Sequence, residues 1–202
     1  MTPSFDPIAS LRRVRPLPPA ILLVALALAG CGTTRYRPVS DDMVRIGRPY
    51  TVRGTHYTPA DLRPYDVVGY ASWYGGESGN QTANGEKFRP RGISGAHTVL
   101  PLPSYVEVTA LDTGKTILVR LNDRGPFTQT RPTPRVIDLS RGAARLLGVE
   151  ASGTIPVHVR RVDPSERDSA RLRKGKPAAS RPDVDPATLA AWRALLGPQP
   201  GR

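Results

Sequence analysis

The sequence is poor in the residues that build disulfide frameworks and metal sites. Among its 202 residues Cys31 is the single cysteine, so no disulfide can form within one chain. The three histidines, at positions 56, 97 and 158, show no spacing typical of metal ligands. We therefore predict neither a metal site nor any other cofactor.

The sequence also lacks an apolar run of the roughly 20 residues that a confident membrane span requires. The shorter apolar run 19–29 follows a basic segment at 12–15 and leads directly into Gly30-Cys31. This pattern resembles the bacterial lipobox, in which the cysteine is lipidated and becomes the first residue of the mature chain. We expect residues 1–30 to be a signal peptide and Cys31 to anchor the chain to a lipid bilayer, outside the cytoplasm. A buried or incidental thiol is the alternative.

The residue after this cysteine bears on the membrane that receives the anchor. Gly32 follows Cys31, where an aspartate would retain a Gram-negative lipoprotein at the inner membrane. The pattern therefore favours the outer membrane, facing the periplasm. In an envelope of another type the anchor would lie in the cell membrane.

Acidic residues are scarce relative to basic ones. Asp and Glu number 17 against 29 Lys and Arg, a formal net charge of +12. Such a balance is typical of nucleic-acid-binding proteins, but a secreted chain does not meet nucleic acid, so we predict none. Many of the charges fall in the segment 167–181, where they suit either anionic lipid headgroups and the acidic cell wall or simply a solvated, disordered tail.

Composition divides the chain after its signal peptide into three parts. Residues 31–66 read as a tether and N-terminal strap, and residues 67–162 as the folded domain. Residues 163–202 form a flexible tail rich in Pro and Arg. Within this tail, the spacing of apolar residues over 186–196 predicts one short helix that begins at Pro186.

The domain shows mainly β patterns. Residues 105–111 and 116–121 alternate around a DTGK turn and predict a hairpin, and 135–139 and 154–162 predict further strands. Ser140 resembles a helix N-cap, and the short helix 141–147 would end at Gly148. These patterns indicate a mostly β fold, a compact barrel with one or two short helices, flanked by flexible segments.

Polar clusters interrupt this β pattern. They read GYASWYG, TANGEKF, AHTVLP and VRLNDRGPF, and they place Glu86, His97 and Asp123 in one domain. Two separated carboxylates and an imidazole are the minimum equipment for acid–base cleavage of a glycosidic bond. An enzyme is therefore the leading hypothesis.

Together with VIDLSRGAARLLGV, these clusters resemble the rare lipoprotein A family over residues 49–162. The resemblance implies a six-stranded double-psi β-barrel and a lytic transglycosylase acting on peptidoglycan glycan strands, often those stripped of stem peptides. Members of the family cut between N-acetylmuramic acid and N-acetylglucosamine without water, because the muramic 6-hydroxyl attacks its own anomeric carbon and leaves a 1,6-anhydro end. The resemblance also implies that Glu86, His97 and Asp123 hold the functional positions.

Each of these three residues has a structural alternative. Asp123 is our choice for the general acid that protonates the leaving oxygen and then deprotonates the 6-hydroxyl; otherwise it is a turn aspartate bonded to backbone amides. Glu86 would stabilise the oxocarbenium-like transition state or assist proton transfer, or it is merely a solvated turn residue. His97 would orient either carboxylate by hydrogen bonding, or it is a satisfied structural histidine.

Neighbouring residues are candidates for substrate binding. We expect Tyr74 to face the groove, Trp73 to be partly buried, and Asn122 and Arg124 to contact sugar hydroxyls or carboxylates. Arg124 has an alternative as an ion-pair partner that lowers the pKa of Asp123 and so opposes acid catalysis. A further polar residue, Asp138, is expected to be structural because it lies just before Ser140.

The sequence departs from the family in two places. Residues 77–81 replace a longer segment of Phe-His-Gly-Arg/Lys type, which bears on subsite preference, and the tail 163–202 is too short for a SPOR domain. Two other functions stay open: a non-catalytic glycan-binding lipoprotein of the cell wall, and a hydrolase on the same fold. The product distinguishes the hydrolase, because hydrolysis leaves a reducing end and lytic cleavage leaves an anhydro end.

Overall fold

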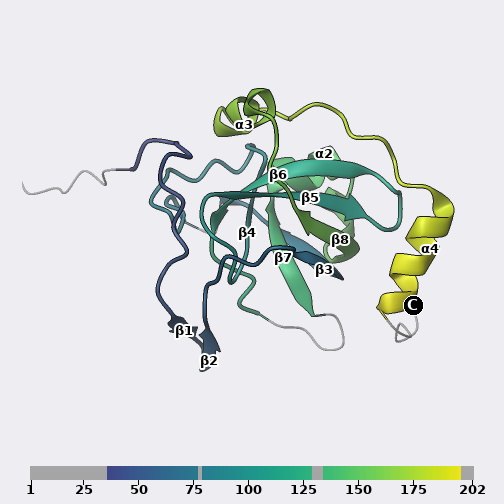
Figure 1. The fold of residues 1–202 in the computed structure, drawn as a ribbon, viewed down its shortest axis with the longest axis horizontal. Helices are drawn as coiled ribbons and strands as arrows, with labels where there is room; N and C mark the ends of the chain where they lie inside the picture. The colour runs from purple at the N-terminus through teal and green to yellow at the C-terminus, as the bar shows by residue number, and fades with distance from the viewer. Residues whose placement is uncertain (1–35, 77–78, 129–133, 197–202) are drawn as a thin grey trace, which may run out of the picture. The chain divides into compact units, whose positions relative to one another are not determined.

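The computed structural model of the protein describes residues 36–76, 79–128 and 134–196 (Figure 1). The expected signal peptide 1–30 and the expected lipid attachment at Cys31 lie outside these ranges, and so do residues 77–78 of the segment that departs from the family. Within the described ranges, no helix has the length and apolar character needed to cross a bilayer.

Six strands close into a barrel, which confirms the predicted mostly β fold class. The strands are β3 (Asp66–Tyr74), β4 (Ser94–Ala96), β5 (Ser104–Ala110), β6 (Thr116–Asp123), β7 (Arg135–Ser140) and β8 (Ile155–Arg161). Around the barrel they follow the order β3-β7-β4-β6-β5-β8, in which β3–β7 and β4–β6 are parallel pairs and the others antiparallel. The predicted hairpin of residues 105–121 is the antiparallel pair β5–β6.

The core fills this barrel with aliphatic side chains. Val106 and Val108 alternate inward along β5, as expected of a strand with one buried face. In β6, by contrast, every residue from Ile117 to Asn122 is buried, because helices α2 (Arg141–Leu147) and α3 (Glu166–Arg173) pack against this strand from outside. Polar residues of β6 are thereby carried into the interior.

Helix α2 has the predicted bounds and both predicted caps. The Ser140 hydroxyl accepts a hydrogen bond from the Ala143 amide at 3.2 Å, and Gly148 adopts the left-handed conformation, with φ 85°. Glycine adopts this left-handed conformation at a helix C-terminus without strain, because it has no Cβ to clash with the backbone. The cap residues at the two ends therefore allowed the bounds of this helix to be predicted from the sequence.

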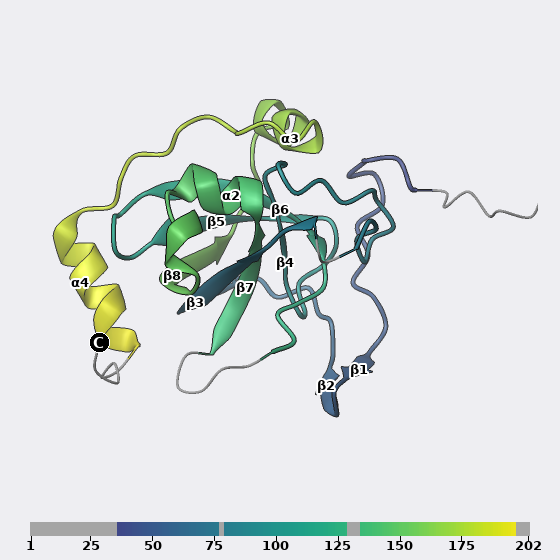
Figure 2. The ribbon, with the colours of Figure 1, turned by 180° about the vertical axis from the view of Figure 1, so that it is seen from behind.

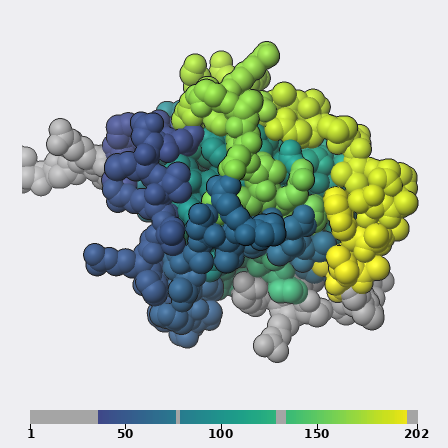
Figure 3. Space-filling view, in the orientation of Figure 1, coloured from purple at the N-terminus to yellow at the C-terminus, as the bar shows by residue number. Residues whose placement is uncertain are grey.

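The C-terminal segment holds more structure than predicted. The expected helix is α4 (Pro186–Leu195), but α3 is a further helix that sequence reasoning missed, so the described residues contain three α-helices rather than one or two. Leu172 of α3 and Leu189 of α4 are buried. Figure 3 shows this segment, yellow-green to yellow, lying along the domain.

Two elements precede the barrel. Strands β1 (Tyr50–Val52) and β2 (Thr55–Tyr57) form a separate hairpin (Figure 2). The cover segment, which we define as residues 36–47, is fixed to barrel loops at both ends: the Arg37 amide donates to the Gly85 carbonyl at 2.7 Å, and Arg45 and Leu102 exchange two backbone hydrogen bonds. Part of the segment expected to be a tether is therefore held against the barrel loops.

Candidate active site

Asp123 ends strand β6, where the register places it opposite Ala96 of β4. Its Oδ1 accepts hydrogen bonds from the amides of Ala83 and Arg124, both at 2.8 Å. Its Oδ2 forms no hydrogen bond within the described part of the chain. Burial raises the pKa of this carboxyl, although the two amides and the Arg124 charge act in the opposite direction. A fixed carboxyl with one unoccupied oxygen and a raised pKa has the properties of a general acid.

Arg124 does not form the ion pair that would oppose this role. Its guanidinium donates to three carbonyl oxygens, those of His97 at 3.1 Å, Leu100 at 2.5 Å and Ile46 at 2.8 Å. It thereby ties the loop after β4 to the cover segment. Its charge lowers the pKa of Asp123 only partly, and the net shift of that pKa remains upward.

Glu86 lies beneath the surface rather than in a solvated turn. Arg120 binds its carboxylate with both terminal nitrogens at 2.8 Å, and the Asn122 amide donates to Oε2 at 3.0 Å. Glu86 and Arg120 are each 2% exposed. A bidentate pair of this kind fixes the orientation of both side chains, so Glu86 holds Asn122 and the loop 82–86 in place next to Asp123.

Arg120 is a site residue that sequence reasoning missed. Its Nε donates to Asp41 of the cover segment at 2.9 Å, and Nη2 donates to the Ser40 carbonyl at 2.9 Å. Asp41 in turn accepts hydrogen bonds from Tyr105 at 2.5 Å and from Arg173 of α3 at 2.6 Å. Burial acts to raise the pKa of Asp41, but these donors lower it overall. The one available sequence signal was an arginine within an apolar strand, which needs a buried carboxylate partner.

His97 is a buried histidine with both ring nitrogens engaged. Nδ1 accepts from the amides of Leu100 at 2.9 Å and Val99 at 3.2 Å, so the ring proton of the neutral form is on Nε2, 2.8 Å from the Tyr65 hydroxyl. Burial, helped by the Arg124 charge, lowers the pKa of His97 from 6.5 to about 3. The ring is neutral at physiological pH and orders the loop behind Asp123 rather than contacting a carboxylate.

This burial predicts a pH dependence of stability. Between pH 6.5 and about 3 the unfolded state carries a proton on His97 that the native state does not. The unfolding free energy should therefore fall as the pH falls from 7 to 5, by about 1.4 kcal/mol per pH unit below 6.5 from this group. Urea unfolding of the wild type at pH 7, 6 and 5 measures this slope. In a His97→Gln variant the slope should be smaller by that amount, and equal slopes in the two proteins would contradict the assignment.

Adjacent residues of β3 face opposite sides, as strand geometry requires. Tyr74 stacks on Phe88 with ring centroids 5.0 Å apart, and its hydroxyl is buried without a hydrogen-bond partner among the described residues. Burial raises the pKa of Tyr74 well above its usual value, and Asp123 and Asp138 add to this rise. Trp73 instead donates from Nε1 to the Glu150 carbonyl at 3.0 Å. The structure thus brings Tyr74, but not Trp73, to Asp123.

Asp138 is a second carboxyl in the same cluster. Strand β4 lies between β6 and β7, so Ala96 faces Asp123 on one side and Asp138 on the other. Ser72 donates to Asp138 Oδ1 at 2.7 Å, Arg135 lies 3.3 Å from the same oxygen, and burial raises the pKa of Asp138. Its position before Ser140 had suggested a purely structural residue. The geometry also makes it a candidate site residue.

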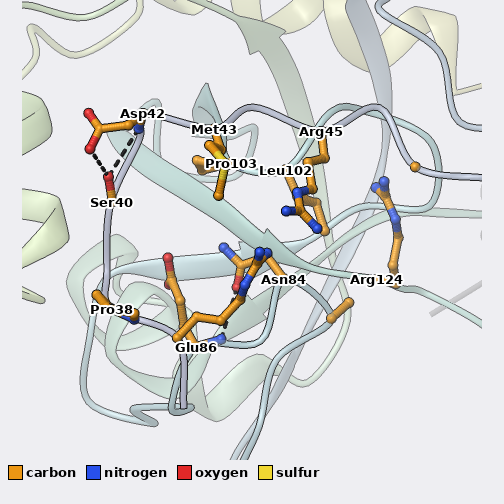
Figure 4. A pocket seen from close by; sticks show the side chains of 13 residues that line it. Pro38, Ser40, Asp42, Met43, Arg45, Asn84, Glu86, Leu102, Pro103 and Arg124 are labelled. Atoms are coloured by element: carbon orange, nitrogen blue, oxygen red, sulfur yellow. Dashed lines mark hydrogen bonds between the residues drawn. The ribbon is translucent and has the colours of Figure 1, made fainter. Parts of the chain in front are cut away.

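A cavity of about 450 Å³ opens beside Asp123, between the cover segment and the barrel loops. Figure 4 shows Met43 and Arg45 of the cover segment on one side, and Asn84 and Glu86 on the other. Ala83, whose amide holds Asp123, also lines it. Its volume is within the range of sites for small organic ligands.

The described residues around Asp123 contribute carboxyl, amide and hydroxyl groups rather than a set of metal ligands. Among the residues that the structure describes, no group of three or more His, Cys, Asp or Glu side chains is arranged to hold a metal ion. Buried acceptor and donor atoms, Asn122 Oδ1 and the Tyr74 hydroxyl, have no protein partner in the same part of the chain. Such buried atoms leave hydrogen-bonding capacity unused inside the barrel, next to the Asp123 cluster.

Sequence comparison identifies relatives of the barrel. The profile of a family described as "Lytic transglycolase" matches residues 66–159. The chain is 51% identical over 132 residues to "Endolytic peptidoglycan transglycosylase RlpA" of Pseudomonas aeruginosa (strain UCBPP-PA14), covering 64% of this chain but 37% of that protein. It is 34% identical over 161 residues to the protein of the same name from Rickettsia felis, covering 69% of each chain. The chain therefore spans little more than a third of the Pseudomonas relative.

Solved structures give weaker similarities. "Streptomyces papain inhibitor (SPI)" is 20% identical, with a TM-score of 0.42, and the match covers 51% of this chain and 100% of that one. An expansin of Clavibacter michiganensis, solved in its apo form, is 21% identical, with a TM-score of 0.37, over 52% of this chain and 54% of that one.

Proposed function

The chain belongs to the family of RlpA endolytic peptidoglycan transglycosylases, and on this premise we propose that it is itself a lytic transglycosylase of peptidoglycan glycan strands. It would cut the bond between N-acetylmuramic acid and N-acetylglucosamine and leave a 1,6-anhydro end. The observation that carries this proposal is the state of Asp123, a buried carboxyl with a raised pKa and an oxygen available to substrate.

The proposed reaction needs one acid–base residue and no water. Protonated Asp123 gives its proton to the glycosidic oxygen as the bond to the muramic anomeric carbon breaks. The muramic 6-hydroxyl then bonds to that carbon, and its proton passes to the Asp123 carboxylate, which restores the starting acid. Asp138 is the nearby carboxyl that we propose stabilises positive charge at the anomeric centre; Ser72 and Arg135 partly offset the burial that raises its pKa.

The other residues named from the sequence have supporting roles in this proposal. Glu86 is bound by Arg120 and acts as a positioning residue for Asn122 and the loop 82–86. His97 positions the loop that Arg124 joins to the cover segment. Tyr74 and Asn122 are expected to support the Asp123 region from inside the barrel, since their free polar atoms are buried, and Trp73 supports β3 from its other face.

The cellular setting is proposed from the sequence pattern. Peptidoglycan lies outside the cytoplasm, so an enzyme acting on it works there. We place the lipid anchor on Cys31 and the domain in the periplasm, at the outer membrane if the envelope is Gram-negative. Mass spectrometry of the N-terminal peptide would detect acyl chains on Cys31, and an unmodified thiol at residue 31 would remove the anchor from the proposal.

The nature of the product tests the reaction. The full-length protein, purified in detergent, is incubated with purified sacculi and with glycan strands stripped of peptides, and the released fragments are analysed by mass spectrometry. We expect fragments one water lighter than hydrolytic products, because the anhydro end forms without water. Fragments with reducing ends would make the protein a hydrolase instead.

A non-catalytic glycan-binding lipoprotein is the second candidate. The observation in its favour is that Glu86 is fully engaged by Arg120 and Asn122, which leaves fewer groups free for chemistry than the sequence suggested. Binding to both substrates with no released fragment would support this candidate and exclude the enzyme.

A further inference from the structure

The cavity beside Asp123 carries an excess of positive charge. Three guanidinium groups line it, those of Arg37, Arg45 and Arg124, and the carboxylates that line it are Asp42 and Glu86 (Figure 4). The Glu86 charge is already neutralised by its bidentate pair with Arg120. The lining therefore favours an anionic ligand.

The cover segment contributes two of these arginines, and its backbone fixes both of them. Arg37 donates from its amide to the Gly85 carbonyl, and its side-chain stem crosses directly over Gly85. A Cβ at Gly85 would lie 2.6 Å from Arg37 Cδ, and Gly85 has a φ of 90°, so a larger residue here would be strained and would displace the Arg37 side chain. Arg45 is fixed through its paired backbone bonds to Leu102.

The guanidinium groups of Arg37 and Arg45 remain available to a ligand. Neither side chain forms a hydrogen bond or an ion pair with another residue in the ranges that the structure describes. Arg124, in contrast, donates to three carbonyl oxygens and contributes mainly its charge. Both arginines line the cavity, and a guanidinium without a protein partner can bind a carboxylate through two parallel hydrogen bonds.

The cavity is linked to the proposed cleavage point through Ala83 and Arg124, the chain neighbour of Asp123, both of which line it. Ala83 lines it and donates its amide to Asp123 Oδ1. A glycan bound with its scissile bond at Asp123 would therefore extend a neighbouring sugar over Ala83 toward the cover segment. In peptidoglycan every second sugar is N-acetylmuramic acid, which carries a carboxylate, either its own free lactyl group or a carboxylate of the attached peptide.

We infer that the cover segment and the loop 83–86 form a subsite for a substrate carboxylate, bound by Arg37 and Arg45. This inference rests on the proposed function for the identity of the ligand but not for the existence of the subsite. It assigns a binding role to a segment that precedes the residues matched by the family profile. Asp41 keeps this wall in place through its bonds to Arg120 and Arg173.

The subsite is tested by measuring ligand binding to a variant that cannot cleave the ligand. The full-length protein with Asp123→Asn is the parent, and Arg37→Gln/Arg45→Gln is added to it. The control is Arg48→Gln, an exposed arginine three residues beyond Arg45 that does not line the cavity. Calorimetry compares four ligands: a muramic-acid tetrasaccharide with free lactyl carboxylates, its methylamide, the peptide-bearing tetrasaccharide, and a chitin tetrasaccharide.

We expect the double variant to bind the free-carboxylate ligand about three- to tenfold more weakly, the modest effect of exposed charge pairs. Its affinity for the methylamide and the chitin ligand should match that of the parent, and Arg48→Gln should match the parent throughout. A loss confined to the peptide-bearing ligand would support the subsite with the peptide as the source of the carboxylate. An equal loss for neutral ligands, or no loss for any ligand, would overturn it.

Failure of the proposed enzyme activity and failure of the proposed subsite give different results in these experiments. If the wild type releases no fragment but the carboxylate-dependent loss is present, the subsite stands and the enzyme does not. If the wild type cleaves and the double variant binds every ligand like its parent, the enzyme stands and the subsite does not.

Discussion

Replacing Asp123 with Asn should reduce the release of anhydro-ended fragments by about a thousandfold, within the range of losses seen when a general acid is removed. Asparagine keeps the size of the side chain and can still accept the hydrogen bonds from Ala83 and Arg124. It cannot donate a proton to the leaving oxygen or take one from the 6-hydroxyl. Fragment release from peptide-free glycan strands, followed by mass spectrometry, measures the effect.

The fold must survive this substitution for the result to be interpreted. Because burial raises the pKa of Asp123, its ionised form is unfavourable in the native state, and a neutral amide should leave the unfolding free energy unchanged or slightly higher at neutral pH. Asp183→Asn is the matched control, since Asp183 is exposed in the tail. If the Asp123→Asn variant keeps a tenth or more of the wild-type fragment release, Asp123 is not the general acid. Asp138→Asn would then be the next variant to examine.

Replacing Arg120 with Met should destabilise the protein by about 3–5 kcal/mol, the usual cost of removing one partner from a buried ion pair. The loss leaves the Glu86 carboxylate uncompensated at 3% side-chain exposure and removes two bonds from the cover segment. Urea unfolding at pH 7 measures the change. The exposed Arg167→Met provides the comparison, with an expected change of less than about 0.5 kcal/mol.

A double variant separates the ion pair from packing. In Glu86→Gln/Arg120→Met the buried charge of Glu86 is gone, so the combined loss should be smaller than the sum of the single losses by about 1 kcal/mol or more. Additive losses, or an Arg120→Met variant as stable as Arg167→Met, would show that the pair does not organise the site.

Local patterns were sufficient to predict much of the barrel. Ser140 and Gly148 carry the information for α2 within a few residues, and the alternation in β5 and β6 with their DTGK turn does the same for the hairpin. Strand β4 was missed because it has three residues, Ser94–Ala96, too few for any periodicity. Helix α3 was missed because its sequence, ERDSARLR, offers little more than Leu172 as an apolar contact.

The connections between the candidate site residues could not be predicted from the sequence. Asp123 was identified by its motif, and its raised pKa depends on burial that only the closed barrel creates. The Glu86–Arg120–Asp41 network joins residues far apart in the chain, and no local pattern encodes such pairing. The neutral state of His97 likewise arises from the fold, since the amides of Val99 and Leu100 fix its tautomer.

The closure of the barrel has a consequence for the order of folding. Strand β3 comes first in the chain and pairs with β7 and β8, so the first strand has no partner until the last two exist. Chains dominated by such distant pairings fold slowly, on timescales of about milliseconds to seconds. A growing chain that ends before Ile155 cannot close the barrel, because β8 is the strand that joins β3 to β5.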